Sequence, residues 1–165
     1  MATGDPTWLR LPPGLLQDAV ADLPGVVARV SEAIITGVPA YDGIAAEHFD
    51  ADLRSGIVSA VLRFAELTGT RQPALGPELR RVCAHLGRGE ARDGRGLESI
   101  LAAYRCGGRV LLADASAAMA ERGLLDAASL VDLGDAVFGY VDELLRATAD
   151  GYAAELAAGA SERDR

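Results

Sequence analysis

The side chains with the greatest capacity for chemistry near the middle of the chain are those of Tyr104 and Arg105, in the run LESILAAYRCGGRV, with Arg109 one helical turn later. A guanidinium group is planar and permanently charged, so it suits carboxylates and phosphates. We therefore predict these three residues as candidates for binding an anionic ligand. The structural alternative is that Arg105 pairs with an acid such as Glu98 or caps a neighbouring helix. This alternative is favoured because buried charges are seldom unpaired.

Histidines and cysteines are few: His48, His85, Cys83 and Cys106. They form neither a zinc-like spacing nor a disulfide framework, and we expect both cysteines to be small core or interface residues. A single histidine without a supporting pattern is weak support for a haem ligand. No nucleophile–base pair and no phosphate loop after a strand can be assembled from local spacing. The sequence therefore predicts no catalytic residue, no metal and no cofactor.

The charge pattern argues against nucleic acid and membrane partners. The net charge is −8, whereas wrapping nucleic acid or an anionic membrane surface needs clustered basic residues. Arginines outnumber acids between residues 71 and 109, but aromatic residues for base stacking are nearly absent there. No run approaches the roughly 18–20 apolar residues of a membrane helix, and no secretory signal is visible. We expect a cytoplasmic protein.

Apolar residues recur at helical spacing along most of the chain, and no segment alternates as a half-buried strand would. Pro24 occupies the first turn of one predicted helix, and Asp126 is the predicted N-cap of the last. The fold prediction is all-α, a single-domain bundle of about five to seven helices. Two long helices are expected near 97–122 and 126–157. The predicted domain division is an irregular segment over 1–14, a helical domain over 15–157, and a polar tail or linker over 158–165.

The first long helix is apolar on two sides. Its main stripe is centred on Gly108 and is expected to pack on the closing helix. The opposite side carries an uncharged strip of Ala102, Cys106, Val110, Ala113 and Ala117. Because monomers seldom leave such a strip in water, we predict a homodimer across it, with Gly107 easing the crossing. The rival interpretation is that the segment around Trp8 and Leu15–Leu16 covers the strip within one chain.

Three runs resemble one known family. In LGRGEARDGRGLESILAAYRCGGRV, a Gly-Arg-rich helix end, a glycine, Leu-Glu-x-x-Leu and Ala-Tyr-Arg-x-Gly follow in order. AVFGYVDELLRATADGYAAE is similar to a closing helix, and VPAYDGI to an early Pro-x-Tyr junction. Together they resemble the RsbRD N-terminal domain family, the RsbT co-antagonist amino-terminal domain, over about residues 15 to 157.

The resemblance implies a non-enzymatic sensory or dimerisation module. Domains of this family stand at the N-terminus of PucR/CdaR-type transcriptional regulators in bacteria, ahead of a middle domain and a helix-turn-helix. Related domains in stress-signalling proteins are dimeric, with a haemless, globin-like fold. An output domain beyond residue 165 is therefore expected, and no direct nucleic-acid binding by these residues. Two alternatives stay open: a stand-alone globin-like protein that binds a small molecule or haem, and a partner-binding antagonist in a stress-signalling assembly.

Overall fold

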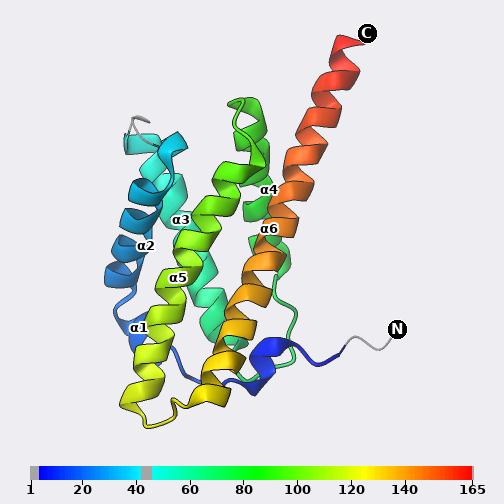
Figure 1. Cartoon of the computed structure of the whole chain (residues 1–165). Coiled ribbons are helices and arrows are strands. Elements are labelled where there is room, and N and C mark those ends of the chain that lie inside the picture. Colours follow the sequence, from blue (N-terminus) through cyan, green and yellow to red (C-terminus); the bar gives the residue numbers. More distant parts are fainter. Residues whose placement is uncertain (1–3, 42–45, 165) are drawn as a thin grey trace.

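The computed structural model describes residues 4–41 and 46–164, without the side chains of residues 46–50 and 52. This part of the chain is a bundle of six α-helices and two short 3-10 helices, and it contains no strand (Figure 1). The all-α, single-domain prediction is confirmed. In chain order the elements are η1 (Thr7–Arg10), α1 (Gln17–Ala21), α2 (Leu23–Gly37), η2 (Pro39–Tyr41), α3 (Ala46–Leu67), α4 (Pro77–Arg92), α5 (Leu97–Glu121) and α6 (Ala127–Arg163).

The helix starts follow local signals in the sequence. Prolines 24 and 77 lie in the first turns of α2 and α4, where the missing N–H has no helical partner to lose. Asp126 caps α6, since its carboxylate accepts from the Ser129 N–H at 2.8 Å and its own N–H donates to the Ser129 hydroxyl at 2.8 Å. This reciprocal cap satisfies two donors that would otherwise be unpaired at the helix end. The predicted N-cap is confirmed.

The buried side chains form two clusters. One lies at the base of α6 and joins it to η1, α3 and α5; it contains Trp8, Leu15, Leu16, Phe64, Met119, Leu133 and Tyr140. The other joins α2 to α3 and contains Val26, Val27, Val30, Ile34, Ile57 and Val61. Within residues 4–41 and 46–164, no helix is long and apolar enough to cross a membrane.

Helix α2 covers part of the small-residue strip on α5, which corrects the sequence interpretation. Ala102, Cys106 and Val110 pack against the α2–α3 cluster. The approach is close: a β-carbon added at Gly37 would lie 2.8 Å from the Cys106 sulfur. The premise that these three residues lack a partner within the chain is therefore wrong. A second copy could contact these three residues only through the part of each that α2 leaves exposed.

The homodimer across this face stays a prediction, and the remaining residues of the face lie as follows. Gly107 faces Val30 of α2, since a β-carbon added at Gly107 would lie 3.5 Å from that side chain. Ala113 and Ala117 are exposed. The intramolecular rival is correct that the chain covers its own strip, but the cover is α2, because Trp8, Leu15 and Leu16 belong to the other cluster. Gly108 does face α6 as predicted, 3.3 Å from Val141 by the same measure.

Helix α6 is the longest element and crosses α4 at very short range. A β-carbon at Gly87 would lie 2.8 Å from the Tyr152 nitrogen, and one at Gly151 would lie 2.6 Å from the Ala84 α-carbon. Beyond this crossing α6 continues to Arg163, past the ends of α4 and α5 (Figure 1). The predicted end near 157 is six residues too early, because the alanine-rich segment that follows has high helical propensity and no proline to stop it.

Candidate functional site

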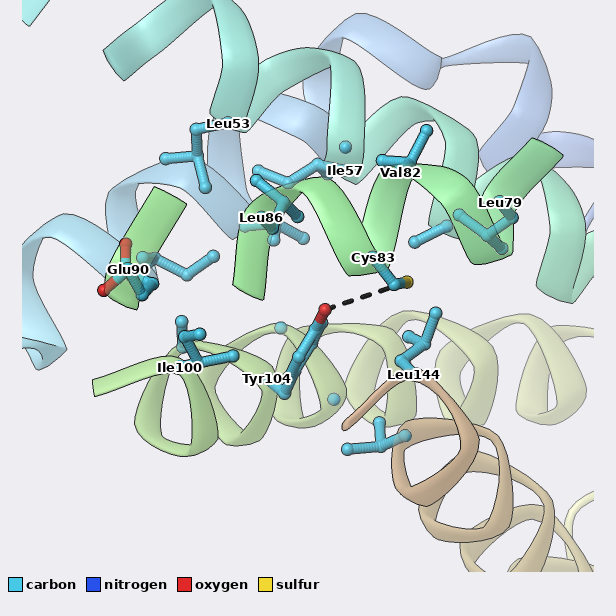
Figure 2. Close-up of a pocket in the computed structure, with 18 of the residues that line it drawn as sticks. Leu53, Ile57, Leu79, Val82, Cys83, Leu86, Glu90, Ile100, Tyr104 and Leu144 are labelled. Carbon is cyan, nitrogen blue, oxygen red and sulfur yellow. Dashed lines mark hydrogen bonds between the residues drawn. The ribbon is translucent and has the colours of Figure 1, made fainter. Parts of the chain in front are cut away.

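A cavity of about 250 Å³ lies in the bundle between α3, α4, α5 and α6, with α2 at its edge (Figure 2). Aliphatic side chains make most of its wall, including Leu53, Ile57, Val82, Leu86, Ile100 and Leu144. Helix α6 contributes Tyr140, Val141 and Leu144. The cavity is therefore a largely apolar chamber, and the helix that projects from the bundle forms one of its walls.

Tyr104 supplies a polar atom inside this chamber. In Figure 2 its side chain points from α5 across the gap towards Cys83 of α4, and the hydroxyl lies 3.9 Å from the Cys83 sulfur. The same hydroxyl is 2.6 Å from the Thr148 hydroxyl, which donates its own proton to the Leu144 carbonyl at 2.8 Å. With the Thr148 proton on the Leu144 carbonyl, Tyr104 is the donor to Thr148, and its oxygen keeps acceptor capacity.

Burial suppresses ionisation of the polar groups in the chamber. It raises the pKa of the Tyr104 phenol far above its ordinary value and raises the pKa of the Cys83 thiol. Burial similarly raises the pKa of the Tyr140 phenol, whose hydroxyl donates to the Ala60 carbonyl at 2.7 Å. These three groups are neutral at pH 7, so this part of the wall presents dipoles and no charge.

One end of the cavity holds a buried ion pair. Arg95 donates to both carboxylate oxygens of Glu90, at 2.7 and 2.8 Å, and also to Asp93 at 2.7 Å. The Glu90 side chain is 9% exposed and that of Arg95 is 23% exposed. The guanidinium carbon lies 5.9 Å from the centre of the Tyr41 ring, and burial raises the pKa of Tyr41 to about 12. The charges at this end neutralise one another in part.

The three predicted ligand-binding residues do not come together. Tyr104 lines the cavity, but Arg105 and Arg109 are exposed, and neither makes an ion pair or hydrogen bond with any residue of the described ranges. The expected pair between Arg105 and Glu98 is therefore wrong. Successive helical residues point about 100° apart, so the backbone that turns Tyr104 inwards turns Arg105 outwards.

The histidines and cysteines are also dispersed. Cys83 lines the cavity, Cys106 faces α2, and both are free thiols. His85 is an exposed residue of the cavity lining, and the side chain of His48 lies outside the described residues. Among the side chains that the structure describes, no three histidine, cysteine, aspartate or glutamate residues gather as a metal site would require.

A row of apolar residues runs along one flank of α6; its first two members are exposed and its last two are half-buried. Val131, Phe138, Leu145 and Tyr152 are spaced by seven residues, and we call them the α6 stripe. Val131 is 63% exposed and Phe138 is 61% exposed. Acidic residues, including Asp135 and Asp142, lie beside the stripe and are exposed.

Sequence reasoning missed the cavity, the Glu90–Arg95 pair and the α6 stripe. The sequence interpretation of GRGEARDGRG, residues 87–96, as a turn between helices is wrong for its first six residues, which form the end of α4. Only residues 93–96 make the turn to α5, with Gly94 at a φ of +71°. The signal available for the ion pair was the position of Glu90 in the last turn of α4 and of Arg95 just after the helix end. Phe138 could have been found because it breaks the otherwise acidic outer face of the closing helix.

Comparison with known proteins identifies the family. The sequence model of the RsbT co-antagonist protein rsbRD N-terminal domain matches residues 24–165, which covers α2 to α6 and the walls of the cavity. No curated protein and no solved structure matches the chain. The globin-like character implied by the resemblance stays a prediction. The family match covers most of the chain, and the protein belongs to the RsbRD N-terminal domain family.

Proposed function

We propose that this chain is a non-enzymatic sensory and dimerisation module of a stress-signalling protein or bacterial transcriptional regulator. The observation that carries the proposal is that α6 takes part in three features of the structure. This helix forms the cavity wall through Val141 and Leu144, presents the α6 stripe to solvent, and projects from the bundle as far as Arg163. One rigid element thus joins an interior chamber to an outer surface and to the place where an output domain would attach.

The proposed mechanism is a shift of α6 against the bundle. Helices packed at an interface move by about 1–2 Å in known switching proteins, and longer lever arms amplify such a shift. A change in the chamber would move α6 relative to α5, and two copies joined through the α6 stripe would then change how their output domains face each other. This arrangement moves the predicted dimer contact from α5, where α2 packs on three of the five residues of the strip, to α6.

The dimer contact is tested by Phe138→Glu. We expect the parent chain to be dimeric at tens of micromolar in sedimentation velocity, and the variant to be monomeric with an unchanged helical circular dichroism spectrum. Loss of a central aromatic contact costs 2 kcal/mol or more in many interfaces, about a thirtyfold weakening. Ala113→Glu, on the exposed part of the α5 strip, is the matched control and should remain dimeric.

Two results would count against this proposal. If Ala113→Glu dissociates the dimer and Phe138→Glu does not, the interface lies on α5 as the sequence alone suggested. If the parent is already monomeric, the α6 stripe serves another protein, as expected for a partner-binding antagonist in a stress-signalling assembly. The second candidate function, binding of a small molecule, is favoured by the largely apolar chamber.

A further inference from the structure

We infer that the chamber between α3, α4, α5 and α6 is a binding site for a small, uncharged, mainly apolar molecule that donates one hydrogen bond to the Tyr104 hydroxyl. This rests on the second candidate function, binding of a small molecule, and names the class of ligand, which neither the family nor the α6 stripe specifies. It can also be tested without an output domain or a dimer.

The volume of the chamber sets the size of the ligand. An apolar cavity of about 150 Å³ stays dry and accepts benzene, so a cavity of about 250 Å³ accommodates about ten non-hydrogen atoms. Two glycines in the wall of the chamber could carry a side chain without a clash, so close packing does not require glycine there. A β-carbon at Gly89 would meet no atom within 4 Å, and one at Gly56 would meet only Leu86, at 3.7 Å. Alanine would fit at both positions and favour the helix, yet the chain leaves these places open.

The charges of the lining exclude an ionic ligand. Glu90, Asp93 and Arg95 are paired with one another at one end, and their sum is negative, which disfavours an anion. No unpaired carboxylate faces the interior to receive a cation, because Glu90 is held by two bonds from Arg95. A charge brought into this apolar chamber would lose its hydration without a counter-ion, which is costly. A neutral molecule avoids that cost.

The polar chain through Tyr104 sets the complementarity of the ligand. The proton of Thr148 goes to the Leu144 carbonyl and the proton of Tyr104 goes to Thr148, so the Tyr104 oxygen can only accept. The Cys83 sulfur, 3.9 Å away, is only a weak hydrogen-bond partner for this hydroxyl. An N–H or O–H group on an otherwise apolar molecule makes a stronger bond there than the thiol does.

The experiment titrates the full chain with three probes and follows backbone amide shifts by NMR. Indole has nine non-hydrogen atoms and one N–H donor, benzofuran has the same shape without the donor, and benzoate carries a charge. We expect indole to bind with shifts confined to the walls of the chamber. Benzofuran should bind about fivefold more weakly, since a net hydrogen bond is worth about 1 kcal/mol. Benzoate should not bind measurably.

Three variants locate the site. Tyr104→Phe should bring the affinity for indole down to that for benzofuran, whereas Arg105→Ala, one residue along the same helix, should leave both unchanged. Ile100→Phe enlarges a buried wall residue into the chamber and should abolish binding of both, in a protein whose amide spectrum stays dispersed.

Several results would overturn the inference: no shifts with millimolar indole, binding of benzoate as tight as that of indole, or indole binding that Arg105→Ala weakens and Tyr104→Phe does not. Failure of the dimer test leaves this experiment intact, because the chamber lies within one chain.

Discussion

Two arginines separated by ten residues show how differently one side-chain type is used in this protein. Arg95 holds the buried Glu90 carboxylate with two hydrogen bonds at the end of the chamber. Arg105 belongs to the Ala-Tyr-Arg motif of the family resemblance, yet it lies in solvent with no ion pair among the described residues. The structure thus assigns the stabilising role to the arginine that the motif does not contain.

This assignment predicts opposite results for two alanine substitutions. Arg95→Ala leaves a buried carboxylate without its counter-charge, so the free energy of unfolding should fall by about 2–3 kcal/mol. Arg105→Ala removes an exposed side chain and should change that free energy by less than about 0.5 kcal/mol. Urea denaturation followed by circular dichroism measures both. A large loss for Arg105→Ala would restore the interpretation of Arg105 as a structural partner.

At the scale of elements, the crossing of α4 and α6 fixes the helix that carries the proposed signal. Backbone meets backbone at this crossing because Gly87 and Gly151 present no side chains. Arg92 strengthens the same contact from the surface, donating to both carboxylate oxygens of Glu155 at 2.8 and 3.1 Å. Helix α6 is therefore held tightly at this crossing as well as by the buried cluster at its base.

Two glycines of α4 give a matched test of that crossing. In Gly87→Ala the new β-carbon would lie 2.8 Å from the Tyr152 nitrogen and closer still to the Thr148 carbonyl. The helices must separate, and the cost of overpacking, about 1–3 kcal/mol, should exceed the gain of about 1 kcal/mol in helical propensity. Gly89→Ala, two residues later, meets no atom within 4 Å and should raise the stability. Thermal unfolding separates the two, and equal melting temperatures would contradict the close crossing.

The elements themselves could be predicted well because their signals are local. Spacing of apolar residues identifies α2 to α6, and Pro24, Pro77 and Asp126 mark three of the starts. The end of α6 could not be placed, because Ala-Ala-Gly-Ala after Leu156 contains no strong stop. The assignment of faces also failed on α5. A helical wheel shows that Ala102 and Cys106 are apolar, but not that α2 returns to cover them.

The candidate site was less accessible to sequence reasoning for a physical reason. A cavity is space that side chains do not fill, and it depends on how four helices sit relative to one another, which no short-range pattern records. Tyr104 was selected correctly as a notable residue, but through a motif that also selected the exposed Arg105. Its partners Cys83 and Thr148 are 21 and 44 residues away in the chain, so only the fold brings them together.

For the whole molecule, the important property is that one helix, α6, contributes both to the chamber and to the α6 stripe. Residues of α6 turned inwards, such as Leu144, line the chamber, and residues turned outwards, such as Phe138, form the α6 stripe. A chain with a net charge of −8 must nevertheless bring two copies of this acidic helix together if the proposed dimer forms. Burial of apolar area and repulsion between like charges then oppose each other.

This opposition predicts an unusual dependence on salt. Because Asp135 and Asp142 lie beside the α6 stripe, two copies meeting there place acids near acids, and added salt screens the repulsion within a Debye length of about 10 Å at 0.1 M. The dissociation constant of the dimer should therefore fall as sodium chloride rises from about 20 to 300 mM, as measured by sedimentation equilibrium. Asp142→Asn should tighten the dimer at low salt and flatten the dependence, whereas Asp18→Asn, on α1, should shift the whole curve only slightly. If salt weakens the dimer instead, opposite charges meet across the interface, and the acidic flank of α6 is not part of it.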